Sequence, residues 1–452
     1  MNKDKALFRQ EREKLLLTGE IPRLFMKYAL PGVAGLLFLG IQSVIDGIVL
    51  GRFVGANALA SVNLVLPCYS LISAFAIVMG IGGQTLVSIS LGRGDKQEAN
   101  NALRSVFVFL LGMSVVVSLV IFLSAGKIAS FLGANEVLLP DAVHYIRVLV
   151  PFFPLLCAMF FGDYIIKAMG HPLYATSVMG MTVVLNIVLD LVFVAVLGWG
   201  VMGAGLATGI AFTMGACFNV PRLFSRHEVV AVQRGRYDQR LVWNAFYNGS
   251  SARMPEVAIT VFLFNITMMR YLGESGVAAF TAINYILFIG TTVFLGISDG
   301  IIPIIGYNYG AGQQERIKSI LKLAAQTNSL IGIGLFLLLL LFGEQVIGLF
   351  FKDHGSEAFE IASRGVSIYC FAFLLCGLNI LASSYFTAIG NAKISIIISA
   401  LRGLVFVGIG ILVLPAVFGI DAIWYDVPIA EICTLSVSFW LVRRSLFNNR
   451  SN

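Results

Sequence analysis

Long apolar runs, separated by short polar segments, dominate the pattern of this 452-residue chain. Each run has about 20 residues or more, the length that a helix needs to cross roughly 30 Å of hydrocarbon. Because lipid offers no partners to open backbone N–H and C=O groups, we expect each run to form a transmembrane α-helix. The twelve spans are predicted near residues 28–50, 58–90, 105–125, 143–168, 172–197, 202–221, 245–269, 277–307, 324–350, 366–389, 394–414 and 422–442.

The composition leads to the same class of protein. Hydrophobic residues make up 58% of the chain and charged residues 12%, about half of the usual charged share of roughly 25%. We therefore predict an all-α polytopic membrane protein. The chain has no GxxxxGK[ST] phosphate loop, its four histidines lack metal-ligand spacing, and its six cysteines form no CxxC pair. These absences argue against an enzyme, an ATP-driven pump or a protein with a metal cofactor.

Basic residues are distributed unevenly between the two sides of the predicted membrane. With the N-terminus inside, most Lys and Arg outside the spans lie on the inner side, and many are in the linker SRHEVVAVQRGRYDQR, residues 225–240. The positive-inside rule then places both termini in the cytoplasm. This asymmetry explains the net charge of +7 without a nucleic-acid partner. The outer loops hold only Arg52, Lys127, Arg270, Lys352 and Arg364.

The chain also repeats itself. RFVGANALAS at 52–61 matches RYLGESGVAA at 270–279, and SLGRGDKQEANNALR at 90–104 matches NYGAGQQERIKSILK at 308–322, both at an offset of 218 residues. KAMGHPLY at 167–174 matches TAIGNAKI at 387–394 at an offset of 220. We predict an N-terminal lobe at 1–224, the basic linker at 225–240 and a C-terminal lobe at 241–452. Each lobe would have six helices, and a pseudo-two-fold axis along the membrane normal would relate them, as in alternating-access transporters.

Polar residues inside the spans are the candidates for chemistry. Asp46 and Asp190 are predicted at the same depth in two outward-running spans, and Asn186 shares a helix face with Asp190 because it precedes it by four residues. An Asp at a span's centre costs about 2.5–3.5 kcal/mol on insertion scales, so such residues usually face a cavity or a partner. Tyr145 and Thr208 are expected at a similar depth. The alternative is that each polar group only joins helices, or lies in the interfacial aromatic belt.

These residues resemble the multidrug and toxic compound extrusion (MATE) transporters, particularly the DinF-like and related bacterial branches. The similarity covers nearly the whole chain: Asp46 before GRFVGANALA, the GRGD loop, the NxxxD of the fifth span and GAGLAT opening the sixth. It implies a monomeric antiporter of the bacterial inner membrane, with H⁺ or Na⁺ as coupling ion. The resemblance also implies a bend of the first helix. The implied cation-coupling site comprises Asp46, Tyr145, Asn186, Asp190 and Thr208, of which Asp46, Asn186, Asp190 and Thr208 are possible Na⁺ ligands.

The C-terminal lobe departs from this pattern, because Phe264 stands where the repeat would place a second Asp46. Members of the family with a C-terminal cation site use a Glu in span seven, which Glu256 resembles, and an Asp in span ten, which has no acid here. Glu256 with Arg253 is therefore either a functional site or a buried ion pair. Asp299, Gln84 and Arg402 are further cavity candidates.

The substrate class follows from the surfaces that such a cavity would offer. Met and aromatic side chains repack around varied ligands, and carboxylates and aromatic faces attract cations. We expect amphipathic organic cations. The alternatives are a lipid-linked oligosaccharide flippase of the same superfamily, or a channel. A flippase would need a cationic cavity for its pyrophosphate headgroup. Apart from Lys167 at the inner end of a span, however, the basic residues within the spans are only Arg147, Arg253 and Arg402.

Overall fold

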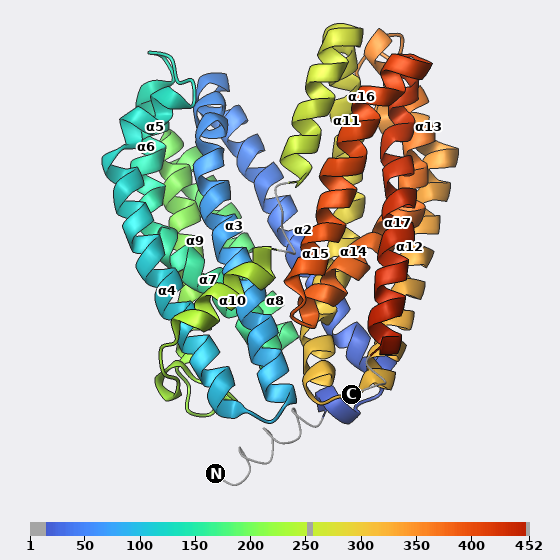
Figure 1. Ribbon diagram of the computed structural model, residues 1–452. Helices are drawn as coiled ribbons and strands as arrows, with labels where there is room; N and C mark the ends of the chain where they lie inside the picture. Colours follow the sequence, from blue (N-terminus) through green and yellow to red (C-terminus); the bar gives the residue numbers. More distant parts are fainter. Residues whose placement is uncertain (1–14, 251–255, 449–452) are drawn as a thin grey trace. The chain divides into compact units, whose positions relative to one another are not determined.

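The computed structural model describes residues 15–250 and 256–448, which form helices and their connections and no strand (Figure 1). The chain divides into two compact units. Unit 1 comprises Met1–Glu20, Leu30–Gly249 and Gly306–Ala311, and unit 2 comprises Ile21–Ala29, Ser250–Ile305 and Gly312–Asn452.

Unit 1 contains most of α2 and the helices up to α10, drawn from blue to green in Figure 1. Short 3-10 turns lie at Val150–Phe152 and Val232–Arg234, and a π-helical turn lies at Leu191–Val196. The helices are α2 (Ile21–Phe53), α3 (Ala56–Gly92), α4 (Lys96–Leu123), α5 (Ala125–Phe131), α6 (Leu139–Leu149), α7 (Phe153–Ala168), α8 (Pro172–Asp190), α9 (Gly200–Leu223) and α10 (Gln239–Ser250).

Unit 2 contains the remaining helices, except the last residues of α11, which belong to unit 1. It has 3-10 turns at Cys370–Ala372 and Ile420–Tyr425 and a π-helical turn at Leu401–Val405. The helices are α11 (Glu256–Gly310), α12 (Gln314–Gly348), α13 (Glu357–Tyr369), α14 (Phe373–Ala388), α15 (Ala392–Ala400), α16 (Phe406–Phe418) and α17 (Asp426–Asn448).

The predicted all-α, multi-span membrane fold is confirmed. Among the described residues, 11 helical segments are long and apolar enough to cross a membrane. One of them, α11, holds both the predicted span at 277–307 and most of the preceding one. Gly273, with a non-helical φ of 60° and ψ of −150°, divides it into two helices. The sequence predicts a connection between the spans at 245–269 and 277–307. In the structure, this connection is the single non-helical residue Gly273.

The internal repeat is visible in the backbone as well as in the sequence. Each of the three matched pairs has a glycine with positive φ at the same place: Gly55 and Gly273, Gly94 and Gly312, and Gly170 and Gly390. Positive φ is costly for residues that carry a Cβ, so glycine is favoured at each of these turns. The two π-helical turns fall in corresponding helices, after α8 and after α15.

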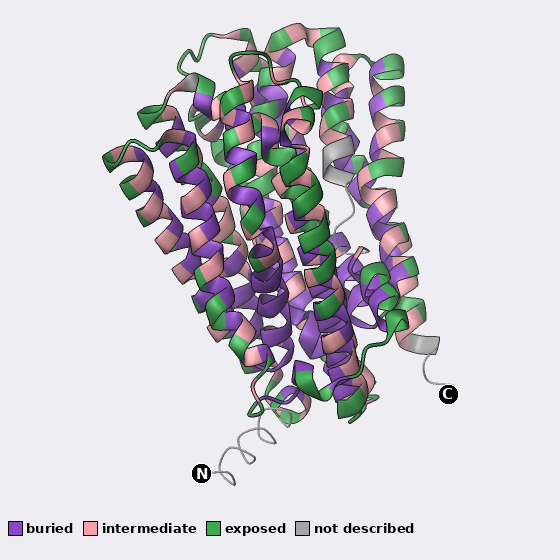
Figure 2. Ribbon diagram, turned by 90° about the vertical axis from the view of Figure 1, so that its left-hand side faces the viewer, coloured by how far each residue is buried: buried purple, intermediate pink, exposed green. Residues whose placement is uncertain are grey.

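Apolar side chains lie on the outside of the helices as well as in the core. Figure 2 shows exposed residues recurring along helices whose inner faces are buried. Many of the exposed residues are large and apolar, such as Leu123 of α4, Leu341 of α12 and Leu412 of α16, which are 73%, 67% and 73% exposed. Water would disfavour such a surface, whereas the hydrocarbon of a bilayer accepts it.

Candidate functional site

Three helices of unit 1 bring a carboxylate–amide cluster together inside the bundle. Asp46 comes from α2, Asn186 and Asp190 from α8, and Thr208 from α9. Asn186, Asp190 and Thr208 are buried, with 0%, 1% and 7% of their surface exposed, and Asp46 is half-buried. The spacing of four residues in VLNIVLD puts Asn186 and Asp190 on one face of α8. That face meets Asp46 and Thr208.

The amide of Asn186 links the members of this cluster. Oriented so that both of its ends are satisfied, it donates from its nitrogen to Asp46 Oδ1 at 3.0 Å and accepts from the backbone N–H of Thr208 at 3.3 Å. In the opposite orientation the same nitrogen donates to Thr208 Oγ1 at 3.4 Å. An amide has both a donor and an acceptor end. Asn186 is therefore able to serve the cluster in two hydrogen-bonding states.

Asp190 is the most unusual member of the cluster. Its carboxyl group faces that of Asp46 within hydrogen-bonding range. Neither of its oxygens accepts a hydrogen bond from an N–H or O–H donor within the described residues. Two carboxyl groups share a hydrogen bond only when one of them carries a proton, because an ionised carboxylate has no donor. The geometry therefore suits a site that holds one proton between Asp46 and Asp190.

The structure adds Gln42, which the sequence analysis missed. Gln42 is 6% exposed, and its side-chain amide contacts that of Asn186 at 2.7 Å and also bonds the Asp46 carboxylate. A signal for it was available, because Gln42 precedes Asp46 by four residues as Asn186 precedes Asp190. Each carboxylate thus has an amide one turn earlier on the same helix face.

Two tyrosines border the cluster. Tyr145 of α6 is 8% exposed, packs against Gly205 of α9 and lies within electrostatic range of Asp46 and Asp190. Tyr69 of α3, which the sequence analysis did not name, lies within range of Asp46. All five residues predicted for the coupling site are thus in one region of unit 1. Their role in coupling stays a prediction.

The helices around the cluster are irregular at positions where bending is easy. Asp190 is the last residue of α8, and the π-helical turn follows it directly; such turns are frequent at functional sites. In α2, Pro31 lies inside the helix, and its carbonyl accepts a hydrogen bond from Thr176 at 2.9 Å. A Cβ at Gly40 or Gly47 would meet no atom within 4 Å. Close packing therefore does not require these two glycines in this conformation, which leaves helix flexibility as their use.

The remaining predicted residues do not join this cluster. Gln84 is fully buried in α3 and donates to the Tyr164 carbonyl at 3.1 Å, so it connects α3 to α7. Asp299 is half-buried in α11 of unit 2. Arg253 and the side chain of Glu256 lie outside the described residues, and their pairing stays a prediction.

Unit 2 has a different buried polar network, built around Arg402. Arg402 Nε lies 2.7 Å from Glu431 Oε1, and Asn379 Nδ2 donates to Glu431 Oε2 at 2.7 Å. Ser438 Oγ donates to Asn379 Oδ1 at 2.8 Å. The sequence analysis named Arg402 but neither Glu431 nor Asn379. Nothing in their spacing pairs them, since they lie on three different helices.

Asp426 of α17 is a further buried acid in unit 2. It is 1% exposed, and its Oδ1 lies where a side chain at Gly410 would begin, 1.7 Å from the position of a Cβ there. The repeat offset of 220 residues pairs Gly410 with Asp190. Gly410 has no side chain, and the carboxylate of Asp426 fills the space that a side chain there would occupy.

Removing one member of the Arg402–Glu431 pair is expected to destabilise the protein strongly. In Glu431→Gln the cation of Arg402 loses its counter-charge inside the bundle, which costs about 3–5 kcal/mol for buried pairs. The thermal midpoint of the purified protein in detergent should fall, and adding Arg402→Met should restore most of the loss. A midpoint that stays unchanged in Glu431→Gln would show that the pair contributes little.

Comparisons with known proteins place the chain among multidrug exporters. The MatE family model matches residues 31–192 and 256–412. The multidrug export protein MepA of Staphylococcus aureus is 22% identical over 439 residues, which cover 96% of this chain and 95% of MepA. A MOP superfamily transporter from Pyrococcus furiosus is 22% identical with a TM-score of 0.89, covering 97% of this chain and 98% of that one. A MATE protein crystallised in a straight and in a bent conformation is 22% identical, with a TM-score of 0.89 for each, covering 97% of this chain and 99% and 98% of those chains.

Proposed function

Because the chain belongs to the MatE family, whose curated relatives here are multidrug export proteins, we propose that it exports amphipathic organic cations in exchange for protons. That it is a multi-pass membrane transporter of the multidrug efflux class follows from the family and the helices. The substrate charge and the coupling ion are our proposal. We further propose that it acts as a monomer in a bacterial inner membrane. The basic linker favours an orientation with both termini in the cytoplasm.

The observation that carries the choice of ion is the pairing of Asp46 with Asp190. The buried carboxyl of Asp190 accepts no hydrogen bond from an N–H or O–H donor among the described residues, and it faces the carboxyl of Asp46. A proton shared between the two carboxyls would stabilise this arrangement. Asn186 supports this choice, because its satisfied orientation turns the nitrogen, not the oxygen, toward Asp46. A Na⁺ ion would require oxygen ligands from these residues, so sodium coupling at Asp46, Asn186, Asp190 and Thr208 is the less favoured form of the proposal.

In the proposed cycle, the amide of Asn186 changes its hydrogen-bond partner when the proton moves between the carboxyls. When Asp46 is ionised, Asn186 and Gln42 both donate to it. When the proton moves onto that carboxyl, Asn186 is able to turn its nitrogen to the Thr208 hydroxyl. Such an exchange alters how α2, α8 and α9 are held together at this depth. The flexible positions Gly40 and Gly47 then allow α2 to bend, as the MATE neighbour with straight and bent conformations supports.

The flippase alternative has less support. A pyrophosphate headgroup calls for several unneutralised cations facing a cavity. Of the basic residues within the predicted spans, Arg402 is paired with Glu431 at 2.7 Å and Lys167 with Asp163 at 2.6 Å. Arg147 is on the exposed surface of α6, and Arg253 lies outside the described residues. We propose no covalent chemistry and no resident cofactor.

A transport assay with separate ion gradients tests the proposal. The purified chain in liposomes should move a fluorescent organic cation when only a pH gradient is imposed, and should not respond to a sodium gradient at equal pH. A neutral dye of similar size and hydrophobicity is the control for substrate charge. Transport driven by sodium alone would overturn proton coupling, and transport of the neutral dye at the same rate would overturn the preference for cations.

A further inference from the structure

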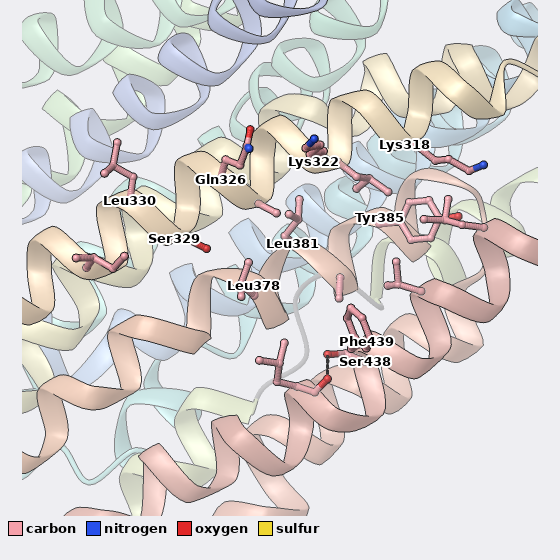
Figure 3. A pocket seen from close by; sticks show the side chains of 17 residues that line it. Lys318, Lys322, Gln326, Ser329, Leu330, Leu378, Leu381, Tyr385, Ser438 and Phe439 are labelled. Carbon is pink, nitrogen blue, oxygen red and sulfur yellow. Dashed lines mark hydrogen bonds between the residues drawn. The ribbon is translucent and has the colours of Figure 1, made fainter.

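Unit 2 has a groove whose charged end corresponds, in unit 1, to a surface that the linker covers. The groove lies between α12, α14 and α17 and has a volume of about 720 Å³ (Figure 3). Its walls are mostly apolar, with Leu378 and Leu381 from α14 and Phe439 from α17, and Lys318 and Lys322 lie at one end. A groove that is charged at one end and apolar along the rest of its walls suits an amphipathic molecule.

In unit 1 the corresponding face of α4 is covered by the linker between the lobes. Val230 and Ala231 of the linker are fully buried, and the Ala231 N–H donates to Asn100 Oδ1 at 2.8 Å. Arg104 Nη1 donates to the Gly235 carbonyl at 3.0 Å. Beside the linker, the Phe107 ring packs at 5.8 Å from each of the Phe161 and Phe224 rings. Backbone and aromatic rings thus fill this face of unit 1 from Asn100 to Phe107. Farther along α4, a hollow of about 540 Å³ remains beside Val108, Gly112 and Tyr237.

The repeat places different residues at the same positions of α12. At the offset of 218 residues, Lys318 corresponds to Asn100 and Lys322 to Arg104, two of the residues that hydrogen-bond to the linker. Ala325 corresponds to Phe107, so a methyl group replaces a ring that fills space in unit 1.

The charge at the end of the groove selects the kind of occupant. Lys318 pairs with the exposed Glu315 at 2.7 Å, whereas Lys322 is exposed and forms no ion pair with any described residue. Arg443 and Arg444 are exposed at the same end of α17. Cations gathered at a groove between membrane helices attract anionic lipid headgroups and repel the organic cations proposed as transport substrates.

The length of the groove fits one leaflet of a bilayer. Its lining on α12 runs from Lys318 to Ile333, a distance of about 22 Å at 1.5 Å per residue. Half of the hydrocarbon core is about 15 Å thick, and the headgroup layer adds roughly 5–8 Å. With the lysines at headgroup depth, the apolar part of the groove therefore reaches about the middle of the membrane.

We propose that this groove binds one anionic phospholipid, with its phosphate at Lys322 and Lys318 and an acyl chain along α12, α14 and α17. The lipid takes, in unit 2, the place that the linker takes in unit 1. It covers the face of α12 between Lys318 and Ile333, and its phosphate supplies a counter-charge for Lys322. This site is distinct from the carboxylate cluster of unit 1 and does not depend on the coupling ion.

Native mass spectrometry of the full chain in detergent tests the proposal, with phosphatidylglycerol and phosphatidylcholine added separately. The wild type should retain one phosphatidylglycerol on the order of tenfold more strongly than phosphatidylcholine, since each surface cation attracts anionic lipid. Lys322→Glu should remove this preference. Arg364→Glu is the matched control, because it makes the same charge change at the exposed Arg364 of α13 and should keep the preference.

A second variant tests the apolar part of the groove without a change of charge. Ala325→Phe places at the half-buried Ala325 the ring that unit 1 has at Phe107, and it should abolish retention of phosphatidylglycerol while the protein stays monodisperse. Equal retention of both lipids by the wild type would overturn the proposal. A preference for phosphatidylglycerol that persists in Lys322→Glu, or retention of this lipid that persists in Ala325→Phe, would place the lipid elsewhere and overturn the proposal as well.

Discussion

Replacing Asp190 by asparagine is expected to reduce pH-driven efflux to the level of liposomes without protein. An asparagine has nearly the volume of the protonated carboxyl and offers an N–H donor to Asp46, so the buried cluster keeps its packing and its hydrogen bond. It binds no proton at physiological pH, and the exchange that drives transport is lost. The measurement is efflux of a fluorescent organic cation from proteoliposomes under a pH gradient.

The control for this variant is Glu136→Gln, which removes an exposed carboxylate of unit 1 outside the spans. It should leave efflux unchanged. Binding of the organic cation to purified Asp190→Asn, followed by fluorescence, should persist, which separates loss of coupling from loss of folding. Efflux at the wild-type rate in Asp190→Asn would refute the assignment of Asp190 as proton carrier.

The second large effect is expected from the link between Asn186 and Thr208. Asn186→Ala removes a hydrogen bond to the ionised Asp46, worth about 1.5–3 kcal/mol, so efflux should fall about 10–100-fold. Thr208→Val keeps the shape of Thr208 but removes the hydroxyl that accepts from Asn186 in its second orientation. It should slow efflux by itself and have no further effect once Asn186 is alanine.

A double-mutant cycle on these two residues measures that coupling. Both single variants keep residual efflux, so the rate of the double variant is measurable. Glu136→Gln combined with Asn186→Ala provides the reference for independent sites. If the losses from Asn186→Ala and Thr208→Val multiply, the two side chains act independently and Asn186 only packs helices.

The helical spans were predictable because the bilayer restricts the choices. An apolar run long enough to cross hydrocarbon forms a helix, whatever its detailed sequence. The turns of the repeat were predictable for a similar reason: Gly94 and Gly312 adopt positive φ, at which other residues are strained. The length of the connection within α11 was not predictable, because nothing near Gly273 tells a one-residue break from a loop.

The candidate site was accessible to sequence reasoning in part. Asp46 and Asp190 stand out because carboxylates are rare in spans, and the spacing of Asn186 places it beside Asp190. Gln42 had the same signal. Tyr69 had none, because a tyrosine in an apolar span is common and only the packing of α3 brings it near Asp46.

By itself, the sequence determined that this protein is a helical membrane transporter with two related halves, since length, apolarity and repetition are properties of the chain. Only the tertiary structure decided which buried groups meet. Arg402, Glu431 and Asn379 are far apart in sequence and lie on separate helices, and their contact depends on how each helix is rotated about its axis. A continuous apolar run does not encode that rotation, because its core-facing and lipid-facing sides are equally hydrophobic. The same limit hid the groove beside Lys322, which depends on how α12, α14 and α17 pack against one another.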